Sequence, residues 1–203
     1  MKNPVSIAIL AGGQSSRMGT NKALSVVGGK RIIDRIVERV QDLSDELIII
    51  ANLPDDYAAL GLPIHADLIP GKGPLGGLYT AISTAPAEYV LVVSCDQPFL
   101  NARLLQYLID QRHGWDVVVP LAADGYPQSM HAVYGKGCLP AILNCLAADK
   151  LKMIGFFAEV RVRTVAGEEI ERIDPARHSF INVNSLADLQ EAEQIAAQQD
   201  APG

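Results

Sequence analysis

The apolar run Tyr89–Ser94 (YVLVVS) is the feature that most constrains how this chain of 203 residues can fold. It is short, rich in β-branched residues and without a polar face, as is typical of a strand buried on both sides of a parallel sheet. Val5–Leu10 and Leu47–Ile50 are runs of the same kind. Because parallel strands are joined by crossover connections that usually contain a helix, these runs predict an α/β fold.

Amphipathic helices are predicted between these strands. Ile32–Leu43 carries its apolar residues at helical spacing, and Asn101 is a typical N-cap for the helix that follows it. Ser185, with Asp188 three residues later, resembles a capping box that opens a final helix. Further helices are predicted over Leu75–Ala85 and Leu139–Ala148, and further strands over Val117–Val119, Met130–Tyr134 and Val160–Val165.

The alternation of strands and helices predicts a mostly parallel sheet with helices on both faces. No internal repeat or linker divides the chain, so we expect a single domain over residues 1–203. Residues 200–203 are expected to form a frayed tail.

Composition limits the partners of this chain. Its net charge of −6 argues against a general attraction to nucleic acid or to an anionic membrane. No apolar run approaches the ~20 residues that span a bilayer. The three cysteines form no CxxC motif, and an odd number of them fits a reducing compartment. We therefore expect a cytoplasmic protein with neither nucleic acid nor membrane as partner.

A glycine-rich loop follows the first predicted strand. Gly12, Gly13 and Gly19 allow backbone amides to approach a phosphate closely. Arg17 and Lys22 add two positive charges, which complement a triphosphate. The spacing matches neither the dinucleotide-binding fingerprint nor a Walker loop. Because of its glycines and its two positive charges, the loop is still interpreted as a phosphate-binding loop. The alternative is a surface turn with incidental charges.

Polar residues are also predicted to lie at the same edge of the sheet. Asp96 comes directly after the strand Tyr89–Ser94 and could hold Mg²⁺, which prefers oxygen ligands; the alternative is a turn residue before proline. Asn182 and Asn184 face one side if extended, and could bind a metal or an acceptor phosphate, or simply precede a helix. Cys95 is interpreted as a small buried hydrophobe, because no histidine lies beside it in the sequence.

Two further polar residues, Asn52 and Asp67, each follow a short predicted strand. Their side-chain oxygens could accept hydrogen bonds from N–H donors of a ligand at this edge, although each could also be an ordinary loop residue. His131 alternates with apolar residues, so we expect a hydrogen-bonded histidine within the sheet.

The loop has the pattern Leu10-Ala-Gly-Gly-x-Ser-x-Arg-Met-Gly-x-x-Lys22, which resembles the signature of nucleotidyltransferases that attach a nucleoside monophosphate to a phosphorylated acceptor. With Gly73–Gly77 (GPLGG), Cys95–Pro98 (CDQP) and Phe180–Asn184 (FINVN), nearly the whole chain resembles the MobA-like nucleotidyltransferase family. The resemblance implies a single-domain, three-layer Rossmann-like nucleotidyltransferase fold.

The resemblance also implies roles for individual residues. Catalysis would fall to Arg17, Lys22 and Asp96, with Mg²⁺ on Asp96 and Asn184 as its second ligand. The acceptor would contact Gln128, Asn182 and Asn184, although Ser129 and Met130 depart from the family's usual Gln-Pro-Leu-x-Ala-Val-Tyr segment. The nucleotide would be bound by Leu10, Ala11, Gly12, Gly13, Lys22, Asn52, Asp67 and Asp96.

The reaction that the resemblance implies is transfer of GMP from GTP to the phosphate of molybdopterin, with release of pyrophosphate. The attacking phosphate is already ionised, so positioning and charge neutralisation suffice and no protein nucleophile is needed. The Gly12-Gly13 pair, where cytidylyl relatives have Ala-Gly, favours guanine. The alternatives are a cytidylyltransferase, an enzyme acting on a sugar or isoprenoid phosphate, and a nucleotide-binding cofactor carrier. A molybdoenzyme or a cofactor chaperone is a possible protein partner.

Overall fold

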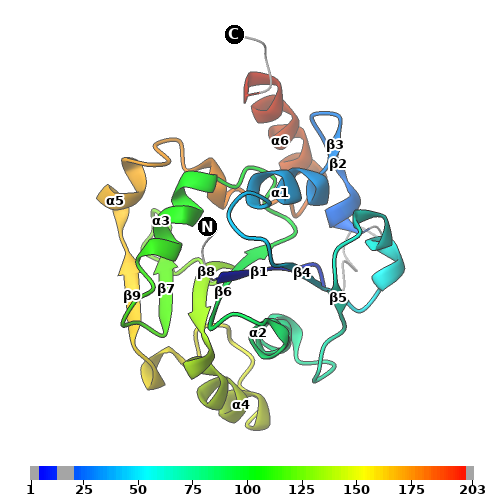
Figure 1. The fold of residues 1–203 in the computed structure, drawn as a ribbon. Coiled ribbons are helices and arrows are strands. Elements are labelled where there is room, and N and C mark those ends of the chain that lie inside the picture. The colour runs from blue at the N-terminus through cyan, green and yellow to red at the C-terminus, as the bar shows by residue number, and fades with distance from the viewer. Residues whose placement is uncertain (1–4, 13–20, 200–203) are drawn as a thin grey trace.

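A seven-stranded sheet forms the centre of the fold (Figure 1). The computed structural model describes residues 5–12 and 21–199, and in these ranges the strand order is β5-β4-β1-β6-β8-β7-β9. Strand β8 is antiparallel to both of its neighbours, whereas the other neighbouring strands are parallel. The predicted mostly parallel sheet is thus confirmed. Its strands are β1 (Val5–Leu10), β4 (Leu47–Ile50), β5 (Ile64–His65), β6 (Tyr89–Ser94), β7 (Val117–Pro120), β8 (His131–Gly135) and β9 (Val162–Val165).

Helices cover both faces of this sheet, as the sequence predicts (Figure 1). One face is covered by α1 (Ile32–Val40), α3 (Ala102–Asp110), α5 (Gly167–Glu171) and α6 (Leu186–Gln199). The opposite face is covered by α2 (Gly73–Thr84) and α4 (Leu139–Ala147). Among the described residues, no helix has the length and the hydropathy that a membrane span requires.

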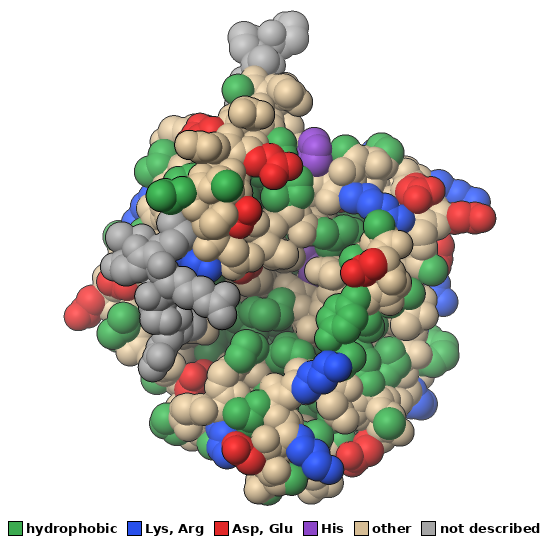
Figure 2. Space-filling view, turned by 180° about the vertical axis from the view of Figure 1, so that it is seen from behind, with side chains coloured by type: hydrophobic (Ala, Val, Ile, Leu, Met, Phe, Trp, Pro, Cys, Tyr) green, Lys and Arg blue, Asp and Glu red, His purple; other side chains and the backbone are tan. Residues whose placement is uncertain are grey.

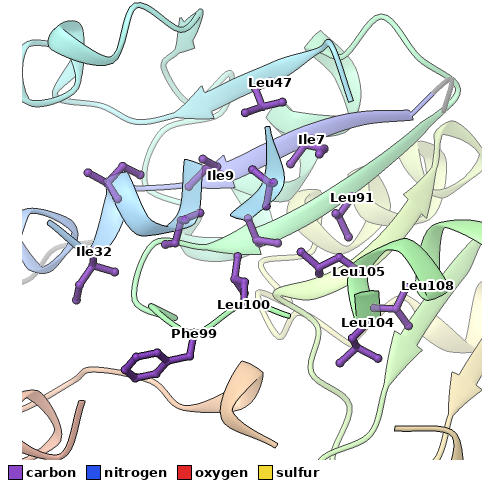
Figure 3. Packing of buried hydrophobic residues seen from close by; sticks show 14 of the residues in the cluster. Ile7, Ile9, Ile32, Leu47, Leu91, Phe99, Leu100, Leu104, Leu105 and Leu108 are labelled. Atoms are coloured by element: carbon purple, nitrogen blue, oxygen red, sulfur yellow. The ribbon is translucent and has the colours of Figure 1, made fainter. Parts of the chain in front are cut away.

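The central strands are apolar on both sides because each side faces a layer of helices. Every residue of β1 is buried. On the α1/α3 side, Ile7 of β1 and Leu91 of β6 belong to the same buried cluster as Leu104, Leu105 and Leu108 of α3 (Figure 3). Burying one such side chain stabilises the fold by roughly 1.5–3 kcal/mol. The two buried clusters therefore hold a layer of helices against each face of the sheet.

Local signals set the helix ends. The side chain of Asn101 accepts hydrogen bonds from the backbone N–H groups of Arg103 and Leu104, which confirms the predicted N-cap of α3. The predicted capping box is also present: Asp188 N–H donates to Ser185 Oγ (3.2 Å), and Ser185 N–H donates to the Asp188 carboxylate (2.9 Å).

Some elements were not predicted. A small hairpin pairs β2 (Val26–Val27) with β3 (Lys30–Arg31), and the short helix α5 follows β9. The edge strand predicted from Val160 begins at Val162. The predicted frayed tail, residues 200–203, lies outside the described residues.

Candidate functional site at the carboxyl edge of the sheet

The site is built where parallel strands β1, β4 and β6 end side by side. The N–H of Ala11 donates to the Ile50 carbonyl (2.9 Å), and the N–H of Cys95 donates to the Leu10 carbonyl (3.1 Å). The Tyr57 hydroxyl donates to the Ala11 carbonyl (3.1 Å). These bonds hold the start of the glycine-rich loop between the ends of two strands, which is where ligands bind in open α/β sheets.

Gly12 lies close to the end of β4. A Cβ atom at this position would lie 3.7 Å from the Ile50 carbonyl oxygen and 3.9 Å from Asn52 Nδ2. The missing side chain therefore leaves room beside Asn52. Gly13 and Arg17, which the sequence also assigns to this loop, lie outside the described residues.

Lys22 begins a short 3-10 helix, Lys22–Leu24, whose N-cap is Asn21. The amide nitrogen of Asn21 donates to Asp56 (2.8 Å) and to the Tyr57 hydroxyl (2.9 Å), which fixes the end of the loop. The ammonium of Lys22 donates to Asn184 Oδ1 at 2.9 Å, across 162 positions of sequence. The fold thus brings together a predicted catalytic residue and a predicted metal or acceptor ligand.

Asp96 stands beside the same segment. Its carboxylate accepts a hydrogen bond from Ser94 Oγ (2.5 Å), and its backbone carbonyl accepts one from the N–H of Val183 (2.8 Å). Val183 lies between Asn182 and Asn184, so the predicted acceptor segment runs alongside Asp96. The role of Ser94 was not predicted, although its place two residues before Asp96 on the strand was a signal for it.

Burial and nearby charges shift the pKa values of two side chains beside this site, those of Cys95 and Asp188. Burial, together with the Asp96 charge, raises the pKa of the Cys95 thiol to about 12, so it is protonated at neutral pH and is a poor nucleophile. Hydrogen bonds from the Asn184 backbone and from Ser185 lower the pKa of Asp188, and the Lys22 ammonium acts in the same direction.

Asn52 and Asp67 bind each other through two hydrogen bonds. Asn52 Nδ2 donates to Asp67 Oδ2 (2.8 Å), and the Asp67 N–H donates to Asn52 Oδ1 (3.0 Å). A Cβ atom at Gly77 would lie 3.8 Å from both Asp67 Oδ1 and the Leu10 side chain. Four predicted nucleotide-binding residues, Leu10, Gly12, Asn52 and Asp67, therefore border one region together with Gly77.

The Gly73–Gly77 motif has a physical role that the sequence did not reveal. Gly73 has a φ of +58°, a conformation that disfavours residues with a side chain. A Cβ at Gly76 would lie only 2.9 Å from Lys72 Cβ and 3.2 Å from the Ile69 carbonyl oxygen. Gly76 thus permits the close turn that leads into α2 beside Asp67.

The other predicted acceptor residues are more dispersed. Asn182 is exposed, and its amide donates to the Phe180 carbonyl (3.4 Å). Gln128 lies on a different element, the turn before β8. There its N–H donates to the Pro120 carbonyl (2.8 Å), and its carbonyl accepts from the N–H of His131 (3.0 Å).

His131 corrects one prediction. It lies within the sheet, opposite Val93 in register, and its ring meets the Phe180 ring edge-on with the centroids 5.2 Å apart. The side chain is fully buried, yet neither ring nitrogen has a hydrogen-bond partner among the described residues. The predicted hydrogen-bonded histidine is therefore wrong in that respect, because the ring packs against Phe180 and no described polar group lies within hydrogen-bond distance of its nitrogens. Burial lowers the pKa of His131 to about 4.

The donor set at this edge limits which metal would fit. Within the described residues, no group of three or more His, Cys, Asp or Glu side chains is placed to hold a metal ion. Asp96 offers a carboxylate and Asn184 a neutral amide oxygen. One carboxylate together with neutral oxygens and ligand phosphates is the environment that Mg²⁺ usually has in phosphate sites, so these residues fit that ion.

The surface seen in Figure 2 is hollowed near its centre, with hydrophobic side chains on the floor and charged side chains around the rim. A separate cavity of about 530 Å³ lies at the opposite edge of the sheet, where Leu47 begins β4 and Leu62 and Pro63 precede β5. None of the predicted site residues that the structure describes lines that cavity.

Comparison with known proteins agrees with this geometry. Residues 7–163 match the model of the MobA-like NTP transferase domain. The chain belongs to the MobA-like NTP transferase family. The resemblance stated from the sequence motifs is thus confirmed, and this MobA-like protein is a nucleotidyltransferase by family.

Named relatives of this MobA-like chain cover almost its whole length. It is 40% identical to a probable molybdenum cofactor guanylyltransferase of Pelotomaculum thermopropionicum, over 93% of this chain and 91% of the relative. It is 34% identical to a molybdenum cofactor guanylyltransferase of Desulfosudis oleivorans, over 91% and 92% of the two chains. The crystal structure of molybdopterin-guanine dinucleotide biosynthesis protein A from Archaeoglobus fulgidus has the same fold, with a TM-score of 0.83, 22% identity and coverage of 96% and 100%.

Proposed function

We propose that the protein transfers GMP from GTP to the terminal phosphate of molybdopterin and releases pyrophosphate. The observation that carries this proposal is the meeting of Lys22, Asp96 and Asn184 at the strand ends, on the edge that also bears the Asn52–Asp67 pair. The names of the relatives support the choice of base and acceptor. A cytoplasmic location, and delivery of the product to a molybdoenzyme or a cofactor chaperone, belong to the same proposal.

The chemistry needs few protein groups. An oxygen of the molybdopterin phosphate forms a bond to the α-phosphorus of GTP, and the bond from that phosphorus to the β-phosphate oxygen breaks. Pyrophosphate leaves with the electron pair. The attacking oxygen is already anionic, so the chain must bring two anions together and stabilise the added charge. The Lys22 ammonium has three donors. One is directed to Asn184, which leaves the others for phosphate oxygens.

The Asn52–Asp67 pair is the part of the site to which we assign recognition of guanine. Asp67 Oδ2 is bonded to Asn52, whereas Asp67 Oδ1 lies on the side of Gly77. We assign this second oxygen to the adjacent N1–H and N2–H₂ donors of guanine. Cytosine has an acceptor at N3 instead of such a pair of donors, so a carboxylate here favours GTP over CTP.

Magnesium is part of the proposal, with Asp96 as its protein ligand. When bound, the ion would neutralise charge on the triphosphate. The Ser94 hydroxyl holds Asp96 Oδ1, which orients the carboxylate. The amide oxygen of Asn184 has two lone pairs: one accepts the hydrogen bond from Lys22, and the other is available to the ion, so Asn184 would serve as the second ligand.

The test is to incubate the purified protein with molybdopterin and each of the four NTPs, and to measure pyrophosphate release and product mass. We expect pyrophosphate and the guanine dinucleotide only when GTP and molybdopterin are both present. Asp96→Asn and Lys22→Ala should each lower the rate by at least about 100-fold, a typical cost of losing one charge-stabilising group. Circular dichroism and thermal melting of both variants should match the wild type.

Other outcomes would point to the alternatives. Release of pyrophosphate with CTP in place of GTP would support the cytidylyltransferase. Binding of a nucleotide with no pyrophosphate release from any NTP would support the cofactor carrier. Undiminished GMP transfer by both variants would remove the mechanism.

A further inference from the structure

We propose that Asp188 is a positioning residue that holds the Lys22 ammonium in place through Asn184, so that helix α6 sets the position of the phosphate-binding lysine. This inference rests on the proposed function, because it assigns Lys22 to the triphosphate. It adds a residue that lies outside the glycine-rich loop and does not itself touch the substrate.

A continuous set of hydrogen bonds connects the two residues. Asp188 Oδ2 accepts from the backbone N–H of Asn184 at 2.8 Å, and Asn184 Oδ1 accepts from Lys22 Nζ at 2.9 Å. On the other side, the N–H of Val183 donates to the Asp96 carbonyl at 2.8 Å. The backbone of Asn184 is thus fixed on both sides, by Asp188 and through its neighbour by Asp96, and its amide is directed at the lysine.

Ordinary helix capping accounts for only part of this arrangement. In a capping box, the side chain at the third helical position reaches the N–H of the N-cap residue. Here the N-cap is Ser185, and Asp188 makes that bond at 2.9 Å. The additional bond to the N–H of Asn184 lies one residue outside the box. This additional bond is the one that connects the cap to Lys22.

The residue type at 184 fits a positioning role. Lysine has a long and flexible side chain, so an unheld ammonium samples many positions. An amide oxygen restrains it without cancelling its charge. A carboxylate at the same place would form an ion pair that competes with the phosphates for the lysine. Asp188 itself is held at the backbone of Asn184, one step away from the ammonium.

Three variants separate positioning from capping. Asp188→Ala removes the capping-box carboxylate and frees Asn184. Ser185→Ala is the matched control, because it removes the bond from the Asp188 N–H and weakens the same helix end, but leaves the bond to Asn184. Asp188→Asn keeps a side-chain oxygen that can accept from Asn184, and should restore most of the function.

The measurements are the affinity for GTP by calorimetry, kcat and KM for GTP transfer, and thermal melting. Both alanine variants should lower the melting temperature by similar amounts. Asp188→Ala should also weaken GTP binding and lower kcat/KM by about tenfold, less than the roughly 100-fold that a 1 Å misplacement can cost. Ser185→Ala should stay within about twofold of the wild type in both measurements. In a Lys22→Ala background, Asp188→Ala should have no further effect on GTP affinity.

The inference is overturned if both alanine variants lose GTP affinity equally, or if Asp188→Ala weakens GTP binding as much without Lys22 as with it. Failure of the proposed function would look different, because the wild-type protein would then transfer no GMP to molybdopterin. The double-mutant cycle of GTP affinities for Lys22→Ala and Asp188→Ala would still test in that case whether Asp188 acts through Lys22.

Discussion

Replacing His131 by leucine should raise the stability of the fold at neutral pH, even though it removes a fully buried side chain. The imidazole packs against Phe180, and neither of its nitrogens has a hydrogen-bond partner among the described residues. A buried donor or acceptor left unpaired costs about 1–3 kcal/mol. Leucine has a similar volume and no polar atom. The variant should therefore gain about 1–3 kcal/mol, or roughly 2–4 °C in melting temperature for each kcal/mol in a chain of this size.

The same substitution should change the pH dependence of stability. In the unfolded chain His131 takes up a proton as the pH falls through 6.5, whereas in the folded protein its pKa is about 4 because the charged form would be buried. The unfolded state therefore binds more protons between these values, and the wild type loses stability as the pH falls from 6.5 toward 4. At about 1.4 kcal/mol per pH unit, that loss approaches ~3 kcal/mol. The leucine variant should lack this part of the acid loss.

Urea unfolding followed by circular dichroism at pH 7, 6, 5 and 4.5 measures both effects. The difference between the variant and the wild type isolates His131, because other titrating groups are common to the two proteins. His113→Gln is a matched control, since it removes another histidine, one that is exposed and not buried. A leucine variant that is less stable at pH 7, together with a difference that does not grow on acidification, would refute the reasoning.

Two further predictions follow from packing and charge. Gly76→Ala should lower the melting temperature, because its methyl group would lie 2.9 Å from Lys72 Cβ, whereas Gly77→Ala should leave the fold intact, because its methyl group would lie 3.8 Å from the nearest atoms. Equal melting temperatures for the two variants would contradict this. Cys95 should resist iodoacetamide in the native protein at pH 8, since its thiol pKa is about 12. Mass spectrometry would show the failure of that prediction as equal labelling of Cys95 in native and denatured protein.

Much of the fold was predictable because its signals are local. Apolar runs gave the central strands β1, β4 and β6, and helical spacing gave α1. The reversed direction of β8 was not predicted, because a strand's sequence carries no direction. The indication was available in the connection from β7, which contains no predicted helix and so favours antiparallel pairing. The hairpin β2–β3 was also signalled, by a Gly-Gly pair between two short runs, with φ values of +58° and +75°.

The site was predictable only where the fold class alone decides position. Asp96 and Asn52 follow strands, so a parallel sheet places both at the carboxyl edge. The Lys22–Asn184 contact depends on how the C-terminal segment packs beside β6, which no local pattern encodes. The lack of hydrogen-bond partners for the His131 nitrogens was likewise not predictable. Alternation along the strand predicts that this side chain is buried, but it does not show whether a polar neighbour lies within hydrogen-bond distance.

The part of the chain after the family match completes the site. The matched residues, 7–163, include Lys22, Asn52, Asp67 and Asp96, which are four of the residues that the proposal assigns to the nucleotide. Asn184, however, lies beyond the match, and it is the residue that holds the Lys22 ammonium. Because Val183 is bonded to the backbone of Asp96, the same segment also ties the lysine to the carboxylate. The two charged groups assigned to the triphosphate are thus kept in register by a C-terminal segment that touches both, and any change that loosens α6 should disturb them together.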